Sequence, residues 1–407
     1  MSDPLDIVVV GAGQAGLSLS HELSSAGVEH VVLERGRVGE TWRGRWDSFR
    51  LVFPNWTVRL PGSPYAGSDP DGYMHRDEVV DHLAAYAAGF RAPVEEGVSV
   101  SGLAMDLEGR FLLETSRGRL RARQVVLACG AYQKPHRPQA AERIPPSVRV
   151  LDAEDYASPE LLPPGPVLVV GSGQTGCQLA EEIAETGAQV YLACGHAPWL
   201  PRRLGGRDIA AWLEETPFWE QTVADLPSPV ARLQAAPQAS GSRGGHDLHY
   251  RTLQASGVTL LGRFIGVRDG AAHFTLDLAE SVAFGDARYA ELCAQIRESC
   301  LRRGLEPPEM PPPPPFAASE LESLDLAGFG AVIFTSGYRP DYATWVKLPE
   351  AFDDLGFPIQ ADGSSTAIDG LHFMGVHFQR KRKSATLLGV AEDAAVLAER
   401  MAGSRRR

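Results

Sequence analysis

The chain has 407 residues, of which 44% are hydrophobic and 22% charged, and its formal net charge is −12. This length allows two or three domains, and the composition is ordinary for a globular protein. The acidic balance argues against a nucleic-acid partner, which needs a basic face. No apolar stretch approaches the roughly 18–20 residues that span a bilayer, so no membrane partner is expected. The five cysteines form no C-x-x-C pair, which predicts a cytoplasmic protein without a metal site.

A first glycine motif follows an apolar segment near the N-terminus. Residues 6–10 are rich in valine and isoleucine, which predicts a strand buried on both faces, and a helix is expected over 14–26. The glycines between them allow a tight turn and a close approach of a pyrophosphate, and the helix N-terminus offers free N–H groups. The residues expected to bind a dinucleotide here are Gly11, Gly13, Gln14, Ala15 and Gly16.

An acidic residue follows at the distance that a dinucleotide site requires. Residues 30–34 predict a second strand, and Glu34 ends it 18 residues after Gly16. A carboxylate at this position bonds the ribose hydroxyls, and Arg35 follows it directly. The alternative is a glycine-rich turn that binds no ligand. The combination of strand, spacing and acid favours the dinucleotide.

The next segment carries a resemblance to a known family. Residues 38–46, with the sequence Val-Gly-Glu-Thr-Trp-Arg-Gly-Arg-Trp, resemble the flavin-containing monooxygenases, a group that includes plant indole-pyruvate monooxygenases, Baeyer–Villiger enzymes and many bacterial flavoproteins. The resemblance implies FAD in the first site, with flavin contacts from Glu40, Thr41, Trp42 and Trp46. Core packing is the alternative for both tryptophans. Asn55 resembles an asparagine that helps to hold the peroxide, and a local turn is its alternative.

A second glycine motif begins 160 residues after the first. Residues 166–170 predict another buried strand, a helix is expected over about 173–186, and the next strand over 189–194. Two such motifs in one chain predict two bound dinucleotides, between which a hydride passes. The residues expected to bind the second one are Gly171, Ser172, Gly173, Gln174, Thr175 and Gly176.

The choice between NADPH and NADH depends on the end of that strand. No acid stands there to repel a 2′-phosphate, which favours NADPH without excluding NADH. In the resembled families an arginine is common where this chain has Cys194. Arg202 and Arg203 are expected to bind the phosphate instead, and simple solvent exposure is the alternative for both.

The resemblance also implies how the chain is divided. Residues 125–130 and 332–340 resemble the segments that cross between two domains, and Cys129, Gly130 and Gly337 in them are expected at the cofactor. The expected fold is α/β with two Rossmann-like dinucleotide-binding domains, the NAD(P)H domain being inserted in the FAD domain. The boundaries are 1–164 and 326–407 for the FAD domain and 165–325 for the NAD(P)H domain.

Three further helices are predicted. A helix is expected over 390–402, and the resemblance implies that Leu388 and Gly389, just before it, lie at the flavin pyrimidine edge. Residues 205–226 are expected to form a helix that lines a cleft, where Trp212, Phe218 and Trp219 serve as substrate wall or, more simply, as core. An amphipathic helix is expected over 288–303.

The resemblance implies an NADPH-dependent FAD monooxygenase that oxygenates a small organic substrate with O₂ at nitrogen, sulfur or a ketone, through a C4a-(hydro)peroxyflavin. Of the family's aromatic- and histidine-containing fingerprint only Tyr156 is present, which argues against a standard Baeyer–Villiger enzyme. An NAD(P)H-dependent flavoprotein reductase without oxygen insertion is the alternative, and a non-enzymatic redox sensor is a third reading. The sequence is compatible with a homodimer.

Overall fold

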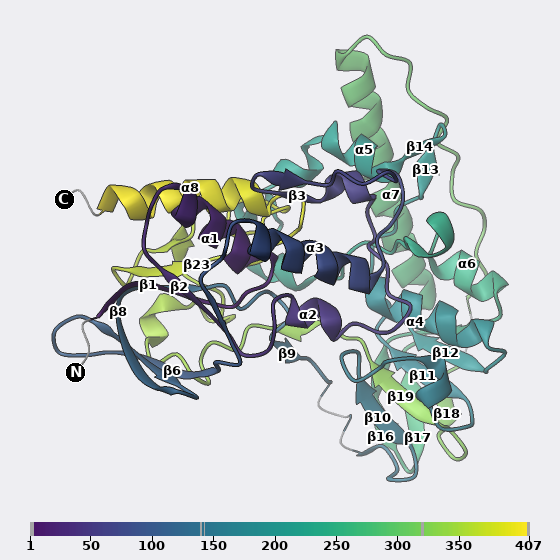
Figure 1. The fold of residues 1–407 in the computed structure, drawn as a ribbon. Helices are drawn as coiled ribbons and strands as arrows, with labels where there is room; N and C mark the ends of the chain where they lie inside the picture. Colours follow the sequence, from purple (N-terminus) through teal and green to yellow (C-terminus); the bar gives the residue numbers. More distant parts are fainter. Residues whose placement is uncertain (1–3, 139–140, 142, 319–320, 405–407) are drawn as a thin grey trace.

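The computed structural model of the chain describes residues 4–138, 141, 143–318 and 321–404. Two larger sheets organise it, a mixed one with parallel central strands and a fully parallel one, with helices packed against them and smaller antiparallel sheets at their sides (Figure 1). The α/β class expected from the sequence is confirmed. No described helix is long and apolar enough to cross a membrane.

The first sheet is built around strand β1 (Leu5–Val10). It pairs in parallel with β2 (Val31–Glu34) on one side and with β8 (Gly118–Leu127) on the other. Residues 7–9 are fully buried, because both faces of the sheet are covered, and this explains the unbroken apolar run. The other strands of this sheet are β5 (Val94–Glu96), β6 (Val100–Met105), β7 (Phe111–Thr115), β21 (Gln360–Ala361), β22 (Ser364–Ser365) and β23 (Leu371–Phe373).

Helices from both ends of the chain cover this sheet. Helix α1 (Gln14–Ser25) packs against α8 (Val390–Ser404), so the first and last helices lie side by side (Figure 1). Helix α3 (Arg76–Gly89) contacts the short helix α2 (Glu40–Arg43). These helices bring the segment before α8 close to the turn between β1 and α1.

The second sheet is fully parallel and has the strand order β10-β19-β11-β12-β15. Strand β11 (Val167–Val170) leads into α4 (Gln174–Glu185), and β12 (Val190–Ala193) follows. Strands β10 (Arg149–Asp152) and β19 (Ala331–Phe334) lie outside 165–325, so the second sheet extends beyond the expected insert at both ends. The last strand is β15 (Thr259–Leu261).

The chain crosses between the two sheets twice, and the two crossings pair with each other. Strand β9 (Lys134–Pro135) is antiparallel to β20 (Tyr338–Arg339). Beside the second sheet, β16, β17 and β18 form an antiparallel sheet. The remaining elements are β3 (Arg59–Leu60), β4 (Ser63–Pro64), β13 (Arg203–Leu204), β14 (Arg207–Asp208), α6 (Tyr250–Ala255), β16 (Phe264–Arg268), β17 (Ala271–Phe274) and β18 (Ser323–Asp325).

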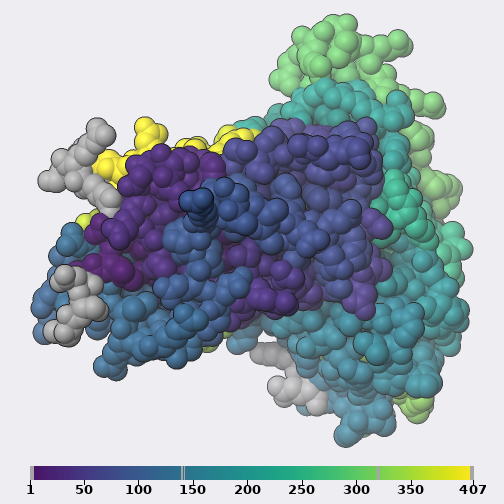
Figure 2. Space-filling view, viewed as in Figure 1, coloured from purple at the N-terminus to yellow at the C-terminus, as the bar shows by residue number. Residues whose placement is uncertain are grey.

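Two helices differ from expectation. The single helix expected over 205–226 is wrong: α5 covers only Ile209–Glu214, and the 3₁₀ helix η4 (Pro217–Glu220) follows. Pro217 explains the break, since proline starts a helix readily but disrupts its interior. Helix α7 (Leu278–Arg302) begins ten residues before the expected 288. It projects from the body of the molecule, at the top of the view in Figures 1 and 2.

Candidate functional site: two glycine turns at parallel sheets

The turn between β1 and α1 has the backbone of a dinucleotide cradle. Gly11 has a φ of 110°, and a side chain there would overlap the Ala128 carbonyl oxygen. At Gly16 a side chain would overlap the Gly11 carbonyl, so the helix can pack this closely only without a Cβ. At Gly13, in contrast, a Cβ would meet nothing within 4 Å. Gly13 therefore leaves open the space that a pyrophosphate would fill.

Glu34 lies beside this turn, as expected for a ribose acceptor. Its side chain is 7% exposed, and its Oε2 accepts a bond from the Ala12 N–H at 2.8 Å. Its Oε1 accepts from the Gly36 N–H at 2.9 Å. These bonds fix the carboxylate, and each oxygen keeps acceptor capacity for a ribose hydroxyl. Arg35 is exposed next to it.

Residues from distant parts of the chain converge on the same turn. The Gln14 Oε1 accepts from the Trp42 Nε1 at 3.0 Å, and the Gln14 Nε2 donates to the Ala385 carbonyl at 3.3 Å. Ala385 belongs to the loop that ends at Leu388 and Gly389. Just after the end of β8, the Cys129 Sγ lies 3.8 Å from the Val10 carbonyl oxygen. The structure thus brings together most residues expected around the first dinucleotide.

Two glycines in the crossing segments adopt left-handed backbone. Gly130 has a φ of 78° and Gly337 a φ of 82°, and a Cβ on either would meet nothing within 4 Å. Gly130 follows β8, which is parallel to β1, and Gly337 comes shortly after β19, which is parallel to β11, so each lies at the same edge of its sheet as the glycine turn. Their expected place beside the cofactor stays a prediction.

Three further residues that were expected to contact the flavin, Glu40, Thr41 and Trp46, have no hydrogen bond to Gln14 of the first turn. The Glu40 carboxylate accepts from the Arg37 N–H at 3.0 Å, and Thr41 is exposed. Trp46 is 5% exposed and meets Phe49 edge-on at 4.9 Å between ring centroids. Trp46 therefore packs in the core, which was the alternative interpretation.

Asn55 has a structural role in this structure. It is 4% exposed, its Nδ2 donates to the Asp69 carbonyl at 2.9 Å, and its Oδ1 accepts from the Met74 N–H at 2.6 Å. Both ends of the amide are bonded to one loop. Asn55 therefore clamps this loop with its Oδ1 and one of its two Nδ2 hydrogens, and the catalytic role expected for it stays a prediction.

The second glycine turn repeats the geometry of the first. Gly171 has a φ of 109°, and a side chain on Gly176 would overlap the Gly171 carbonyl oxygen. The Ser172 Oγ accepts from the Gly195 N–H at 2.9 Å, which fixes the turn to the end of β12. Thr175 is half-buried in the first turn of α4.

A segment of chain lies across this second turn. A Cβ on Gly173 would come 3.3 Å from the Ala235 Cβ. The Gln174 Nε2 donates to the Pro237 carbonyl at 3.1 Å, and the Gln238 Nε2 donates to the Ser172 carbonyl at 2.8 Å. The second turn therefore fits a dinucleotide by its backbone, but residues 235–240 already contact its mouth.

The two arginines expected at a 2′-phosphate are engaged elsewhere. Arg202 is 2% exposed, and its Nη2 pairs with the Asp208 Oδ1 at 2.5 Å. Its Nη1 donates to the Val52 carbonyl at 2.7 Å, so Arg202 joins the two halves of the molecule. Arg203 donates to the carbonyls of Gly244 and Gly245. The phosphate-binding role expected for Arg202 is corrected to that of a buried ion-pair partner.

Another arginine lies at the end of β12. A Cβ on Gly195 would come 3.8 Å from the Arg263 Cγ, and the Arg263 side chain is 62% exposed. Its Nε pairs with the Asp277 Oδ2 at 2.5 Å, and neither terminal nitrogen bonds another of the described residues. His196 is exposed nearby and stacks on Phe284 at 4.9 Å. Arg263 was not found from the sequence, because it reaches the end of β12 only through the fold.

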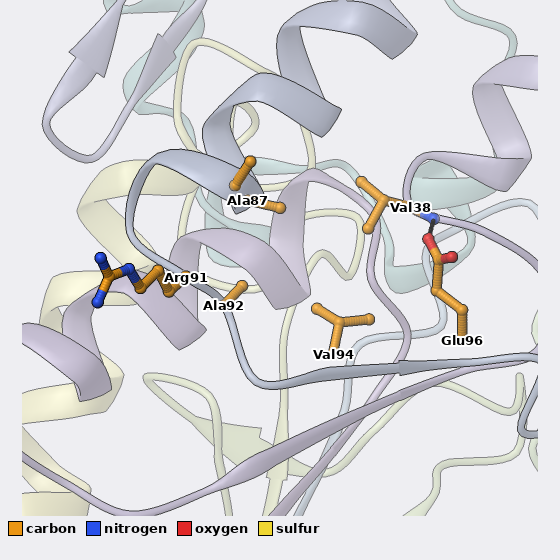
Figure 3. Close-up of a pocket in the computed structure, with 7 residues that line it drawn as sticks. Val38, Ala87, Arg91, Ala92, Val94 and Glu96 are labelled. Carbon is orange, nitrogen blue, oxygen red and sulfur yellow. Dashed lines mark hydrogen bonds between the residues drawn. The ribbon is translucent and has the colours of Figure 1, made fainter.

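Two cavities lie away from the glycine turns. One, of about 320 Å³, is lined mainly by small apolar residues of α3 and β5; its Glu96 accepts from the Val38 N–H, and Arg91 points away from it (Figure 3). The other, of about 210 Å³, is polar and includes Trp46, Gln178 and Glu182. Neither contains a glycine of the two motifs. The described residues hold no cluster of side chains suited to a metal ion.

Comparisons with known proteins agree with this geometry. An uncharacterized CzcO-like oxidoreductase of Geobacillus kaustophilus is 29% identical over 399 residues, 98% of either chain. The indole-3-pyruvate monooxygenase YUCCA1 of Oryza sativa subsp. japonica is 30% identical over 204 residues, 49% of this chain and 50% of that protein. The structure of a flavin-containing monooxygenase from Stenotrophomonas maltophilia matches with a TM-score of 0.69 and 20% identity, covering 99% of this chain and 100% of that one.

The family model for pyridine nucleotide-disulphide oxidoreductases matches residues 8–223, just over half of the chain. This range includes both glycine turns and the crossing from one sheet to the other. The chain is therefore a member of the pyridine nucleotide-disulphide oxidoreductase family, and it is similar to the flavin-containing monooxygenases.

Proposed function

We propose that the protein is an NADPH-dependent FAD monooxygenase that inserts one oxygen atom of O₂ into a small organic substrate, at nitrogen, sulfur or a ketone. The observation that carries this proposal is the repetition of one glycine turn at the parallel strands of two sheets in a single chain. The similar monooxygenases from plants and from Stenotrophomonas maltophilia support it. FAD, when bound, supplies hydride acceptance and the activation of oxygen.

We assign the two cofactors to different turns. The first turn would hold FAD, with Gly13 at the pyrophosphate and Glu34 at the ribose. The second would hold the nicotinamide nucleotide, with no acid at the end of β12 to repel a 2′-phosphate. Each turn belongs to one Rossmann-like domain, and we place the crossing between these domains at the paired strands β9 and β20.

Cysteine chemistry favours oxygen over a disulfide as the electron acceptor. All five cysteines lie in the described part of the chain and are free. Cys129 is the most exposed of them and is half-buried, and even there burial raises the pKa of the thiol to about 12. A thiol that stays protonated at neutral pH is a poor nucleophile toward a disulfide. The reductase interpretation would therefore need a quinone or a partner protein as acceptor.

The test is whether an oxygen atom of O₂ is transferred to the product. The purified FAD-loaded protein is mixed with NADPH, ¹⁸O₂ and a panel of amines, thioethers and ketones, and the products are analysed by mass spectrometry. We expect one labelled oxygen atom in the product of at least one class, with NADPH consumed in equal amount. If NADPH consumption yields only hydrogen peroxide or a reduced quinone, the protein is a reductase and the proposal is wrong.

A further inference from the structure

The loop between β23 and α8 contains four consecutive cations, residues 380–383, and three of them are neutralised by carboxylates. The Lys381 Nζ contacts a Glu220 oxygen at 2.5 Å, and the Lys383 Nζ contacts the other at 2.7 Å. Both lysines also pair with Glu392. Two lysines thus share two carboxylates, and their charges cancel.

Carboxylates also neutralise the charge of Arg380, but no carboxylate neutralises that of Arg382 among the described residues. Arg380 pairs with Asp362 at 3.2 Å and with Asp393 at 3.4 Å. Arg382 forms no ion pair with any carboxylate of the described residues. Its Nε and Nη2 instead donate to one neutral acceptor, the Gln221 Oε1, at 3.0 and 2.6 Å. Arg382 is therefore a cation without a counter-charge.

The aromatic surroundings of Arg382 partly remove its charge from water, which is energetically unfavourable. Its guanidinium lies over the Phe218 ring at 4.5 Å and over the Phe378 ring at 5.1 Å. Burial lowers the pKa of Arg382 from its ordinary value. Gln221 takes two of the five N–H groups of the guanidinium, so up to three are left for a ligand. A partly desolvated cation usually has an anionic partner.

A donor without a partner belongs to Trp219, the residue that follows Phe218. Trp219 is 7% exposed, and its Nε1 is buried without an acceptor in the described part of the chain. The neighbouring Trp212, in the same apolar cluster, donates to the Leu204 carbonyl at 3.1 Å. Phe218 contacts both residues, because its ring lies under the Arg382 guanidinium and meets the Trp219 ring at 5.0 Å. An unpaired buried N–H costs about 1–3 kcal/mol, which a ligand would recover.

We propose that Arg382 and Trp219 bind the carboxylate of an acidic organic substrate with an apolar body. Both groups offer only donors, so the complementary ligand group offers only acceptors and a negative charge. Phe53 meets Trp219 at 5.3 Å, and Leu388 belongs to the same cluster, so an apolar wall adjoins the donors. That this acid is a substrate rests on the proposed function, because Leu388 is the residue expected beside the flavin. The binding of the acid to Arg382 and Trp219 does not depend on that function.

The experiment compares acids with their neutral amides. Phenylacetate and phenylacetamide, and 3-phenylpropionate and its amide, are titrated onto the FAD-loaded protein by calorimetry, without NADPH. We expect at least one acid to bind about tenfold more tightly than its amide, the usual value of a charge-assisted hydrogen bond. Arg382→Met should abolish this preference. Trp219→Phe should reduce it about threefold or more, while thermal stability stays the same or rises because an unpaired donor is removed.

Two matched variants serve as controls. Arg207→Met removes another guanidinium stacked on an aromatic ring, 4.7 Å above Trp212, and should leave the preference unchanged. Trp212→Phe removes an N–H that is bonded, so it should lower stability and keep the preference. The proposal is overturned if both amides bind as tightly as their acids, or if Trp219→Phe retains the full preference. Neither result depends on oxygen insertion, so failure of the monooxygenase proposal would be seen separately.

Discussion

Individual glycines decide where a phosphate can approach this protein. Gly11 and Gly16 are required by the fold, because a side chain on either would overlap backbone atoms. Gly13 is different, since its φ of −80° is open to any residue and its Cβ would project into free space. A side chain at Gly13 therefore blocks a ligand without disturbing the protein.

This difference gives a prediction for Gly13→Val. The variant should fold with nearly unchanged thermal stability but should be colourless, because the valine occupies the space expected for the FAD pyrophosphate. The measurement is flavin absorbance per protein after purification. Gly89→Val is the matched control, since Gly89 also has nothing within 4 Å of its Cβ, and it should retain the flavin. A yellow Gly13→Val protein would place FAD elsewhere.

At the scale of elements, the end of β12 determines the choice of nicotinamide. Arg263 is the exposed cation at this end, whereas Arg203 is bonded to the carbonyls of residues 244 and 245. Arg263→Gln should therefore lower the ratio of kcat/KM for NADPH to that for NADH by about tenfold, the loss of a charge-assisted contact. Glutamine can still bond Asp277, which limits structural damage.

Arg203→Ala is the control for this measurement. It should leave the ratio of kcat/KM for NADPH to that for NADH unchanged within about twofold, because Arg203 bonds a loop and does not lie at the end of β12. If the ratio changes in Arg203→Ala and not in Arg263→Gln, the 2′-phosphate binds at Arg203, as expected from the sequence.

A pH-dependent contact joins helix α4 to the loop at residues 240–246. The His246 Nε2 lies 2.8 Å from the Glu181 Oε1, and this bond raises the pKa of His246 above its ordinary value of 6.5. A raised pKa in the folded state means that the contact stabilises the protein fully below pH 6.5 and is lost as pH rises through the folded pKa.

His246→Gln should therefore lower the melting temperature more at a pH below 6.5 than at an alkaline pH. Thermal unfolding of both proteins across this range measures the difference. In a Glu181→Gln background the effect of His246→Gln should no longer vary with pH, because the carboxylate that raises the pKa is absent. A pH-independent difference in the parent background would mean that the ion pair does not form.

At the scale of the whole molecule, a few contacts fix the two sheets relative to each other. Figure 2 shows that the N-terminal part, with the C-terminal helix, and the middle of the chain form two adjoining bodies. Glu220 of η4 binds Lys381 and Lys383 of the loop before α8, and Arg202 bonds the Val52 carbonyl. The relative position of the two cofactors would depend on these contacts.

Glu220→Gln should loosen this junction without unfolding the protein. Glu220 is 51% exposed, so we expect a cost of about 1 kcal/mol or less. Hydrogen exchange of residues 376–389 should nevertheless become faster, since two lysines lose a shared carboxylate. Glu291→Gln, which breaks an exposed pair with Arg288 on α7, should leave that exchange unchanged. Equal exchange in both variants would show that other contacts hold the loop.

The sequence by itself determined the local elements that depend on short-range pattern. The two buried strands, their glycine turns and the following helices lie within one or two residues of the expected positions, because backbone sterics and burial on both faces act over a few residues. Glu34 was found for the same reason, since its spacing from Gly16 is set by one helix and one strand.

Only the tertiary structure decided which side chains are free for a ligand. Arg202 and Asn55 are polar residues near the expected sites, yet partners far along the chain use their bonding groups: Val52 and Ser240 for Arg202, and Asp69 and Met74 for Asn55. Arg382 looked like one cation among four, and its missing counter-charge depends on how the loop meets η4. Hydrogen-bond satisfaction is set by long-range packing, and sequence spacing does not encode it.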